Sequence, residues 1–412
     1  VVVMTVGGYL LVALADGPAV PADLWVLLGW VFGLYVVAHV AIRRLAPGAD
    51  ATLLPLAAAL NGVGFVTISR LDRELARVQS IWVAVGVATF VGVLVVVRDS
   101  RWLARYRYTF ALLGVGFLLL PLVGGVGRTI NGARLWVSIG PLNFQPGEIA
   151  KVLLVIFIAA YLADKREVLA AGTVRIGRMF LPALRDLGPL GLAWGVSILV
   201  MVYEKDLGSS LLFLGVFAAM LYMATGRVFY VVIALVLFAV GAGLAYNAFD
   251  HVQVRVETWL DPWQDRDDTG FQIIQSWYAF GTGGLAGTGL GLGNPDKIPN
   301  AATDFVFSAI GEELGLVGTI AIVVAFMLLV GTAYRIAVDA TRPFQKLFAA
   351  GLATILGFQT FIILGGVTRL IPLTGITLPF VSYGGSSLVA NFAVLALLLR
   401  ISDETARERS EA

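Results

Sequence analysis

The sequence predicts an all-α polytopic membrane protein of about 12 transmembrane helices, each needing roughly 20 apolar residues to cross the bilayer. Hydrophobic residues make up 58% of the 412 residues, charged residues only 14%, and the mean hydropathy is +0.87. Soluble domains carry about 25% charged residues. The apolar residues also form a succession of long runs. We therefore interpret these runs as helices in a bilayer.

The predicted spans follow one another from the first residue almost to the last. The short first run could also be a signal peptide, because Ala13-Leu14-Ala15 resembles a cleavage site, but no basic region precedes it. The spans lie near residues 1–15, 22–42, 51–69, 79–97, 108–126, 147–164, 188–203, 207–224, 227–246, 304–334, 345–366 and 380–400.

The positions of Lys and Arg predict the orientation, because cytoplasmic loops of membrane proteins carry an excess of both. With the amino end in the cytoplasm, the inner segments hold 18 of the 29 basic residues and the outer segments hold 10, while Lys151 lies within a span. This assignment puts both termini in the cytoplasm and makes residues 247–303 a large extracytoplasmic loop. Water and ionisable side chains gather there, so we expect the substrate to be met on the outer face.

Cysteine and histidine usage narrows the chemistry. The chain has no cysteine, which excludes a disulfide framework, thiol catalysis and cysteine-ligated metals. Its two histidines, His39 and His251, exclude a histidine-rich metal site. The net charge of +2 is too small for a bulk field that would recruit nucleic acid. We therefore expect neither a cysteine-ligated or histidine-rich metal site nor a nucleic-acid partner.

Carboxylates crowd the middle of the outer loop. Trp259 and Trp263 flank them and suit the headgroup level of a membrane. Their spacing fails the EF-hand template, so a calcium loop is not predicted. Two interpretations stay open, namely a solvated acidic turn with aromatic anchors and a set of carboxylates placed for chemistry. The carboxylates are those of Glu257, Asp261, Asp265, Asp267 and Asp268.

Two other segments receive structural interpretations. The run from Gly281 to Gly293 has no G-x-G-x-x-G pattern and follows no predicted strand, so we expect flexible loop backbone rather than a dinucleotide site. On the cytoplasmic side, residues 165–187 alternate basic and apolar side chains. We expect this segment to lie along the membrane interface as an amphipathic helix.

A second candidate site lies where the sixth span begins. Gln145 and Pro146 start a helix that carries Glu148 and Lys151, and residues three apart share one helix face. An ion pair inside a span is costly unless it lines a cavity or pairs internally. The two charges either form a structural pair that fixes helix packing, or Lys151 and the positive amino end of the helix face an anionic group such as a pyrophosphate.

Two further polar clusters lie at the ends of spans. Glu204, Lys205 and Asp206 form a turn so short that all three residues lie at one membrane boundary, where Asp206 could simply cap the following helix. The segment LPFVSYGGSS at 378–387 breaks the entry to the last span. Irregular backbone at membrane depth must be buried in protein or line a cavity.

Five motifs, in order along the chain, resemble the signature of the SEDS family, whose members include RodA, FtsW and SpoVE. The resemblance extends from about residue 51 to residue 401. It implies a ten-helix core at 47–412, preceded by two additional transmembrane helices at 1–46, as in some members of the RodA branch. The motifs are GPLNFQPGEIAK, EKDLGSS, DPWQDRDDTGFQIIQS, TDFVFSAIGEELG and PLTGITLPFVSYGGSS.

The resemblance implies a peptidoglycan glycosyltransferase that polymerises lipid II at the outer face of the cytoplasmic membrane, for cell-wall synthesis and cell elongation. It also implies a class B penicillin-binding protein as partner. In the family pattern N-P-W-x-D-P-x-G-x-G-Y-Q the essential aspartate matches Asp265, in the large outer loop. Arg266, Asp268 and Phe271 depart from that pattern, so Asp267 or Asp268 could share the task.

Other positions also depart from the family motifs. Gly147 replaces the serine of Q-P-S-E, and the family's Q-P-D-L-G-T appears as Glu204-Lys205-Asp206-Leu207-Gly208-Ser209. Arg134 lies one place before the usual arginine of G-A-x-R-W, so its role is open.

The implied reaction assigns the residues their roles. A sugar hydroxyl attacks an anomeric carbon, and a lipid pyrophosphate leaves as an anion, so the acid and nucleophile pair of glycoside hydrolysis is not required. A base for the hydroxyl and cations for the leaving group suffice. We expect Asp265 to be the base, Lys151 and Arg134 to offset pyrophosphate charge, and Glu148 to orient Lys151.

Further substrate contacts are expected from Gln145, Asp206, Ser382 and Ser386. No cofactor is required, although a divalent cation, Mg or Mn, could bridge the pyrophosphate and a carboxylate. Two other functions stay open. A lipid II flippase would use the same polar residues within the spans but would not need a carboxylate in the outer loop. A non-catalytic scaffold would only recruit the transpeptidase.

Overall fold

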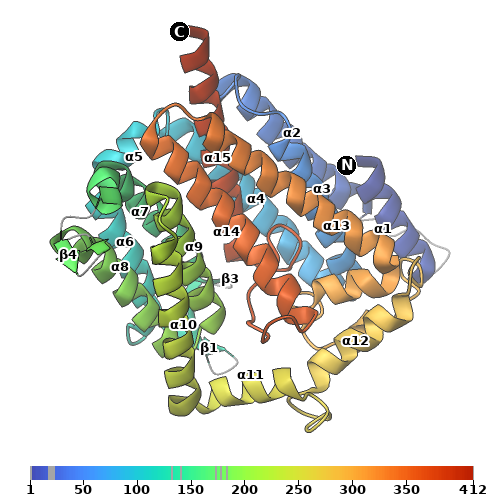
Figure 1. Ribbon diagram of the computed structural model, residues 1–412. Helices are drawn as coiled ribbons and strands as arrows, with labels where there is room; N and C mark the ends of the chain where they lie inside the picture. Colours follow the sequence, from blue (N-terminus) through green and yellow to red (C-terminus); the bar gives the residue numbers. More distant parts are fainter. Residues whose placement is uncertain are drawn as a thin grey trace. The chain divides into compact units, whose positions relative to one another are not determined.

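The computed structural model describes residues 2–16, 24–130, 133–139, 142–171, 174–176, 179–181 and 184–411 (Figure 1). The predicted all-α polytopic fold is confirmed. Within these ranges, ten helices are long and apolar enough to cross a membrane. Two shorter apolar helices, Val3–Ala15 and Arg107–Leu122, lie where the first and fifth spans were predicted. The chain is a multi-pass membrane protein.

Local sequence signals mark several helix ends. α7 begins at Pro146, whose fixed φ suits the first helical position. α9 is followed by Gly226 in the left-handed conformation, with φ 68°. α13 is interrupted at Gly315, where φ is 64°. The helices are α1 Val2–Asp16, α2 Leu24–Leu45, α3 Leu53–Leu71, α4 Arg73–Val96, α5 Arg101–Arg105, α6 Arg107–Leu119, α7 Pro146–Ala171, α8 Leu184–Tyr203, α9 Leu207–Thr225, α10 Val228–Ala248, α11 Asp250–Leu260, α12 Phe271–Gly283, α13 Val306–Asp339, α14 Pro343–Val367 and α15 Gly385–Glu411.

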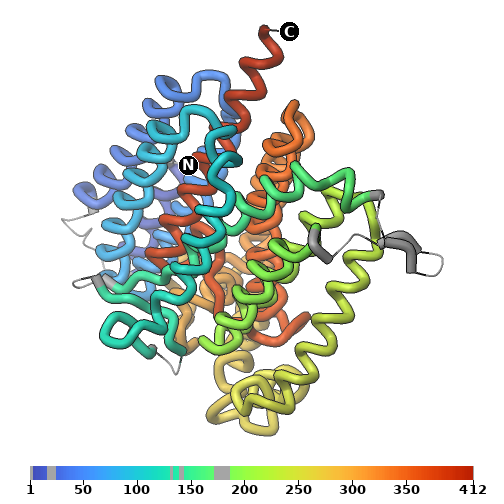
Figure 2. The backbone as a smooth tube through the Cα atoms, turned by 90° about the vertical axis from the view of Figure 1, so that its left-hand side faces the viewer, coloured from blue at the N-terminus to red at the C-terminus, as the bar shows by residue number. Residues whose placement is uncertain are grey.

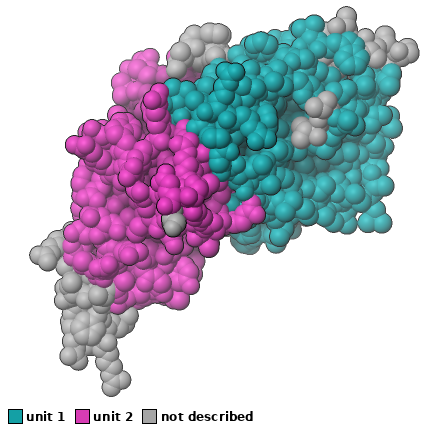
Figure 3. Space-filling view, turned by 90° about the horizontal axis from the view of Figure 1, so that it is seen from above, with its two compact units in different colours: residues 1–95, 246–332, 359–396 teal, residues 96–245, 333–358, 397–412 magenta. Residues whose placement is uncertain are grey.

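The chain forms two compact units, coloured separately in Figure 3. Unit 1 consists of residues 1–95, 246–332 and 359–396. Unit 2 consists of residues 96–245, 333–358 and 397–412. Each unit is described by itself below.

The amino-terminal helices of unit 1 pack around one apolar cluster, and Figure 2 shows α1 to α4 in blue. Tyr9 of α1 stacks on Phe65 of α3, with ring centroids 6.3 Å apart. Burying such side chains stabilises the helix packing, at roughly 25 cal/mol per Å² of apolar surface removed from water. The buried members of the cluster are Tyr9, Val12, Leu28, Val31, Phe65, Val66, Ile68 and Ala76.

The predicted break before the last helix is a largely buried non-helical segment, between the end of α14 and the start of α15. Its backbone groups bond to side-chain amides on the surrounding helices. Asn61 Nδ2 donates to the Phe380 carbonyl at 2.9 Å, and Gln359 Nε2 donates to the Thr377 carbonyl at 2.9 Å. Irregular backbone is tolerated at this depth because protein partners satisfy its polar groups.

The predicted large outer loop, 247–303, contains the helices α11 and α12. The expectation of flexible backbone in its glycine run was wrong. The amides of Thr288 and Gly289 donate to the carbonyls of Glu312 and Glu313 at 2.9 and 3.0 Å. A Cβ at Gly287, where φ is +82°, would lie 2.2 Å from the Glu313 carbonyl oxygen. Glycine is required here for a close, ordered approach to α13.

Unit 2 is built on α7, which packs against α6 and α9. A Cβ at Gly114 of α6 would lie 2.8 Å from Leu154 of α7, so the small residue permits close helix packing. A three-stranded antiparallel sheet in the order β1-β2-β3, which was not anticipated, leads directly into α7. Its strands are β1 Gly127–Ile130, β2 Ala133–Ile139 and β3 Leu142–Phe144.

The amphipathic helix predicted over 165–187 was wrong. α7 continues to Ala171, and an antiparallel pair follows, formed by β4 Val174–Ile176 and β5 Met179–Leu181. Alternation of polar and apolar residues has a period of two, which is the period of a strand and not of a helix.

Candidate functional site

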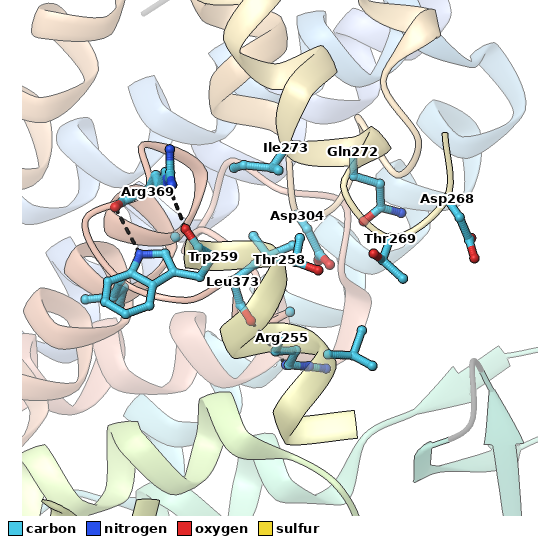
Figure 4. Close-up of a pocket in the computed structure, with 14 residues that line it drawn as sticks. Arg255, Thr258, Trp259, Asp268, Thr269, Gln272, Ile273, Asp304, Arg369 and Leu373 are labelled. Carbon is cyan, nitrogen blue, oxygen red and sulfur yellow. Dashed lines mark hydrogen bonds between the residues drawn. The ribbon is translucent and has the colours of Figure 1, made fainter. Parts of the chain in front are cut away.

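Unit 1 contains a cavity of about 380 Å³ between α11, the start of α12 and the segment that follows α14 (Figure 4). This volume lies in the range of small-molecule sites. Charged, amide, hydroxyl and aromatic side chains line it together with aliphatic ones. The lining residues are Val254, Arg255, Thr258, Trp259, Asp268, Thr269, Gln272, Ile273, Asp304, Gly366, Arg369, Ile371, Leu373 and Gly375.

Two arginines fix the walls of the cavity by binding backbone carbonyls. Arg255 of α11 donates from Nη1 to the carbonyls of Leu373 and Thr374 at 3.3 and 3.0 Å. Arg369 donates from Nε to the Trp259 carbonyl at 2.7 Å and from Nη2 to the Leu260 carbonyl. Trp259 Nε1 in turn donates to the Arg369 carbonyl at 3.1 Å. The planar guanidinium group satisfies the last carbonyls of α11, which have no partner within the helix.

Asp304 is half-buried in the cavity, in the turn before α13. Figure 4 shows it near the middle of the lining side chains, close to Gln272 and Thr258. Ser382 Oγ donates to the Thr303 carbonyl at 2.5 Å and so holds this turn. Burial raises the pKa of Asp304 to about 6, against the opposing effects of the Arg255 guanidinium and a hydrogen bond from Thr303.

Asp265 lies in the turn that leads into α12, and its side chain is exposed. Its Oδ2 accepts hydrogen bonds from the Thr269 hydroxyl at 2.9 Å and from the Thr269 amide at 3.3 Å. Its carbonyl accepts from the Gly270 amide at 2.9 Å. A Cβ at Gly270 would lie 1.9 Å from the Pro262 carbonyl oxygen, so the turn requires glycine. Asp265 is thus one hydrogen bond from the cavity, through Thr269.

The neighbouring aspartates differ in position. Asp268 lines the cavity, whereas Asp267 pairs with Arg266 at 3.4 Å on the exposed side of the turn. An exposed pair of this kind contributes at most about 1 kcal/mol to stability.

In unit 2, Glu148 and Lys151 form the predicted pair at the start of α7. Lys151 Nζ donates to Glu148 Oε2 at 2.5 Å, and the two residues are 4% and 9% exposed, with Lys151 the more buried. Burying two charges costs several kcal/mol per ion unless they are paired and hydrogen-bonded. Their close contact therefore explains how both stay inside the fold.

Unit 2 contains a small cavity of about 10 Å³. Residues at the starts of α7 and α9 line it, including Gln145, Gly147, Glu204 and Asp206. This volume is about the smallest that can hold one water molecule. Asp206 accepts a hydrogen bond from the Ser209 amide at 2.9 Å and caps α9, as the simpler interpretation predicted. Glu204 is buried, and its Oε1 has no hydrogen-bond partner among the described residues. Burial and the Asp206 carboxylate raise the pKa of Glu204 to about 8.

The other predicted contacts fall on structural positions. Arg134 in β2 donates from Nη2 to the Val123 carbonyl at 3.2 Å. Ser382 accepts from the Leu378 amide at 2.9 Å as well as holding Thr303, and Ser386 is buried at the start of α15. Their substrate contacts, like that of Gln145, stay predictions.

The structure separates the predicted residues into two groups. Asp265, Ser382 and Ser386 belong to unit 1, and the remaining predicted site residues belong to unit 2. Sequence reasoning missed Arg255, Asp304 and Arg369 as cavity residues. Asp304 lay within the quoted motif TDFVFSAIGEELG, at the start of the predicted span 304–334, which was the available signal. No group of three or more His, Cys, Asp or Glu residues suited to a metal ion occurs in the described part of the chain.

Comparison with known proteins identifies the family to which this chain belongs. A family model for FtsW, RodA and SpoVE, described as "Cell cycle protein", matches residues 56–407. "Peptidoglycan glycosyltransferase RodA" of Mycobacterium tuberculosis (strain ATCC 25618 / H37Rv) is 47% identical, and the alignment covers 97% of this chain and 88% of that protein. "Probable peptidoglycan glycosyltransferase FtsW" of Geobacter sp. (strain M18) is 36% identical, with 87% and 98% covered.

A solved structure has a similar fold. It is described as "Structural coordination of polymerization and crosslinking by a peptidoglycan synthase complex". The matching chain is 30% identical with a TM-score of 0.71, and the match covers 87% of this chain and 98% of that one. The fold and the sequence motifs therefore agree.

Proposed function

Because the chain belongs to the FtsW/RodA/SpoVE family of SEDS proteins and is a peptidoglycan glycosyltransferase of the RodA type, we propose that it polymerises lipid II at the outer face of the cytoplasmic membrane. In this proposal both termini are cytoplasmic and residues 247–303 are extracytoplasmic. The asymmetry of Lys and Arg supports that orientation. The product serves cell-wall synthesis during elongation.

Asp265 is the proposed general base. The observation that carries this role is its hydrogen bond to Thr269, because Thr269 lines the cavity of unit 1. The Asp265 carboxylate is exposed and is held by the turn that precedes α12. In that position it can accept the proton of a sugar hydroxyl while the hydroxyl oxygen attacks the anomeric carbon.

Lys151 is the proposed cation for the departing pyrophosphate. It lies in the first turns of α7, where unpaired amides and the helix dipole favour an anion. Glu148 holds the ammonium in place through the 2.5 Å hydrogen bond. Arg134 is a second proposed cation. Gln145, Asp206, Ser382 and Ser386 are proposed substrate contacts, and Mg or Mn could assist without being required.

The proposed partner is a class B penicillin-binding protein that cross-links the new strand. The support is the similar chain solved within a peptidoglycan synthase complex. The relatives are named as glycosyltransferases, which favours the enzyme over a flippase or a scaffold.

The test is polymerisation of labelled lipid II by the purified full chain with its partner. We expect glycan strands from the wild type and a loss of about 100-fold to 10,000-fold in rate for Asp265→Ala, as for removal of a general base. Asp267→Ala is the matched comparison, because Asp267 is exposed on the same turn outside the cavity. We expect near-normal polymerisation from it, and an equal loss would show that Asp267 shares the role of base. Undiminished polymerisation by Asp265→Ala would overturn the role of the base. Transport of lipid II without any polymer would overturn the enzyme assignment in favour of a flippase.

A further inference from the structure

The cavity of unit 1 has balanced charge. Arg255 and Arg369 line it together with Asp268 and Asp304. Both guanidinium groups bind backbone carbonyls, and Arg369 also lies over the Trp277 ring, 5.1 Å from its centroid. Because two positive and two negative side chains share the cavity, its field does not favour a multiply charged anion. The arginines hold the walls.

The remaining polar groups suit hydroxyl groups. Thr269 and Gln272, around the start of α12, meet Asp304, which lies before α13, at the cavity (Figure 4). A carboxylate offers about four acceptor positions, an amide offers both donors and acceptors, and a threonine hydroxyl does both. A ligand rich in hydroxyl groups can use all of them, whereas an ionised pyrophosphate diester has no proton to donate to an ionised carboxylate.

Apolar surface lies beside these polar groups. Trp259, Ile273 and Ile371 line the same cavity. A sugar ring presents C–H groups on its faces and hydroxyl groups at its edge, so it needs both kinds of wall. Small-molecule sites commonly combine apolar and aromatic walls with a few placed polar groups.

We propose that this cavity binds a sugar ring of the acceptor substrate, with Asp304 accepting a hydrogen bond from one of its hydroxyl groups. The ligand class is an N-acetylated saccharide without phosphate, and the lipid pyrophosphate lies outside this cavity. The inference rests on the proposed function and deepens it. Asp304 acts as a binding residue, Arg255 holds the wall around it, and Asp265 keeps its separate role as base.

The first test measures binding without chemistry. The probe is the soluble, labelled disaccharide of peptidoglycan, which lacks lipid and pyrophosphate, and it is applied by equilibrium dialysis to the full chain in detergent. We expect saturable binding by the wild type and a loss of about 10-fold to 100-fold in affinity for Asp304→Asn, as for loss of a charged hydrogen bond. Equal affinity of the wild type and Asp304→Asn would overturn the proposal, and so would displacement of the label by inorganic pyrophosphate.

A second variant blocks the cavity without removing charge. Thr258→Phe places a large side chain on the α11 wall. We expect it to abolish disaccharide binding while the apparent unfolding temperature stays near that of the wild type. Binding that survives Thr258→Phe would place the sugar elsewhere and would overturn the assignment.

Polymerisation kinetics add a readout that a merely structural role would not change. We expect Asp304→Asn to raise the KM for lipid II about 10-fold or more, while Asp265→Asn lowers kcat. Asp304→Glu should recover part of the lost affinity. In the wild type, KM should rise as the pH falls through about 6, because a protonated Asp304 is a weaker acceptor. The charged groups around it are Arg255 on α11, Asp268 before α12 and Arg369 after α14.

The two failures can be told apart. If the wild type binds the disaccharide but never polymerises lipid II, the proposed function fails while the sugar site stands. If the wild type polymerises lipid II and Asp304→Asn has an unchanged KM, the sugar site fails while the proposed function stands.

Discussion

The cavity of unit 1 and the Glu148–Lys151 pair of unit 2 use charge in opposite ways. In unit 1 the arginines bind carbonyls, and the carboxylates of Asp304 and Asp268 line an open cavity of about 380 Å³. In unit 2 a lysine and a glutamate are buried against each other, with Nζ and Oε2 2.5 Å apart. Charges beside an open cavity keep some hydration, whereas the buried pair depends on each partner. Substitution of the cavity carboxylates should therefore cost function, whereas substitution within the buried pair should cost stability.

The largest effect is expected for the buried pair. Lys151→Met or Glu148→Gln alone removes the 2.5 Å contact between the two buried side chains, which should lower the free energy of unfolding by about 3–5 kcal/mol. The double variant Glu148→Gln/Lys151→Met should recover most of that loss, measured as the apparent unfolding temperature in detergent. If the double variant also recovers polymerisation, the pair is structural and Lys151 is not the pyrophosphate cation. Recovered stability with lost activity supports the catalytic role.

A smaller effect is expected for the arginine that holds the cavity wall. Arg369→Lys keeps the charge but loses the forked contact with the carbonyls of Trp259 and Leu260 and the contact over Trp277. We expect about 2 kcal/mol of local destabilisation, on the scale of hydrogen bonds to charged groups. Hydrogen exchange should quicken at the end of α11. Arg266→Lys, on the exposed side of the same loop, is the control and should change little.

Glu204→Gln tests a buried acid of unit 2. The folded state keeps Glu204 protonated up to about pH 8, whereas the unfolded chain ionises from about 4.5. Protons are lost on unfolding between these values, so this residue makes stability fall as the pH rises from 4.5 to about 8. Glutamine removes that dependence and should stabilise the fold by about 1–3 kcal/mol at pH 8, with little effect at pH 4.5. Unfolding temperatures at the two pH values are compared, with exposed Glu167→Gln as the control. An equal gain at both would contradict the prediction.

The smallest effect is expected at the cap of α9. Asp206→Ala removes the acceptor for the Ser209 amide and should cost about 1 kcal/mol, whereas Asp206→Asn retains a capping oxygen and should cost little. Thermal unfolding of both variants measures the cap, and polymerisation measures any substrate contact. A large loss of activity in Asp206→Asn at unchanged stability would show that the carboxylate does more than cap the helix.

Several local features were predictable because neighbouring residues determine them. Pro146 starts α7, Asp206 caps α9, and the chain is non-helical just before α15, as expected from the segment 378–387. The error at 165–187 had a local cause too, because the alternation there was that of strands. These signals act within a few residues of the chain.

The sequence by itself determined the membrane fold, the order of the spans, the family and the contact of Glu148 with Lys151, three residues apart on one helix. Only the tertiary structure decided that Arg255, Asp304 and Arg369 share one cavity, since they lie on α11, before α13 and after α14. It also decided that Asp265 is exposed beside Thr269 while Asp304 is half-buried. Helix periodicity and capping are short-range and can be read from the chain. A cavity is formed by distant segments that packing brings together. Local sequence patterns do not predict which segments these are.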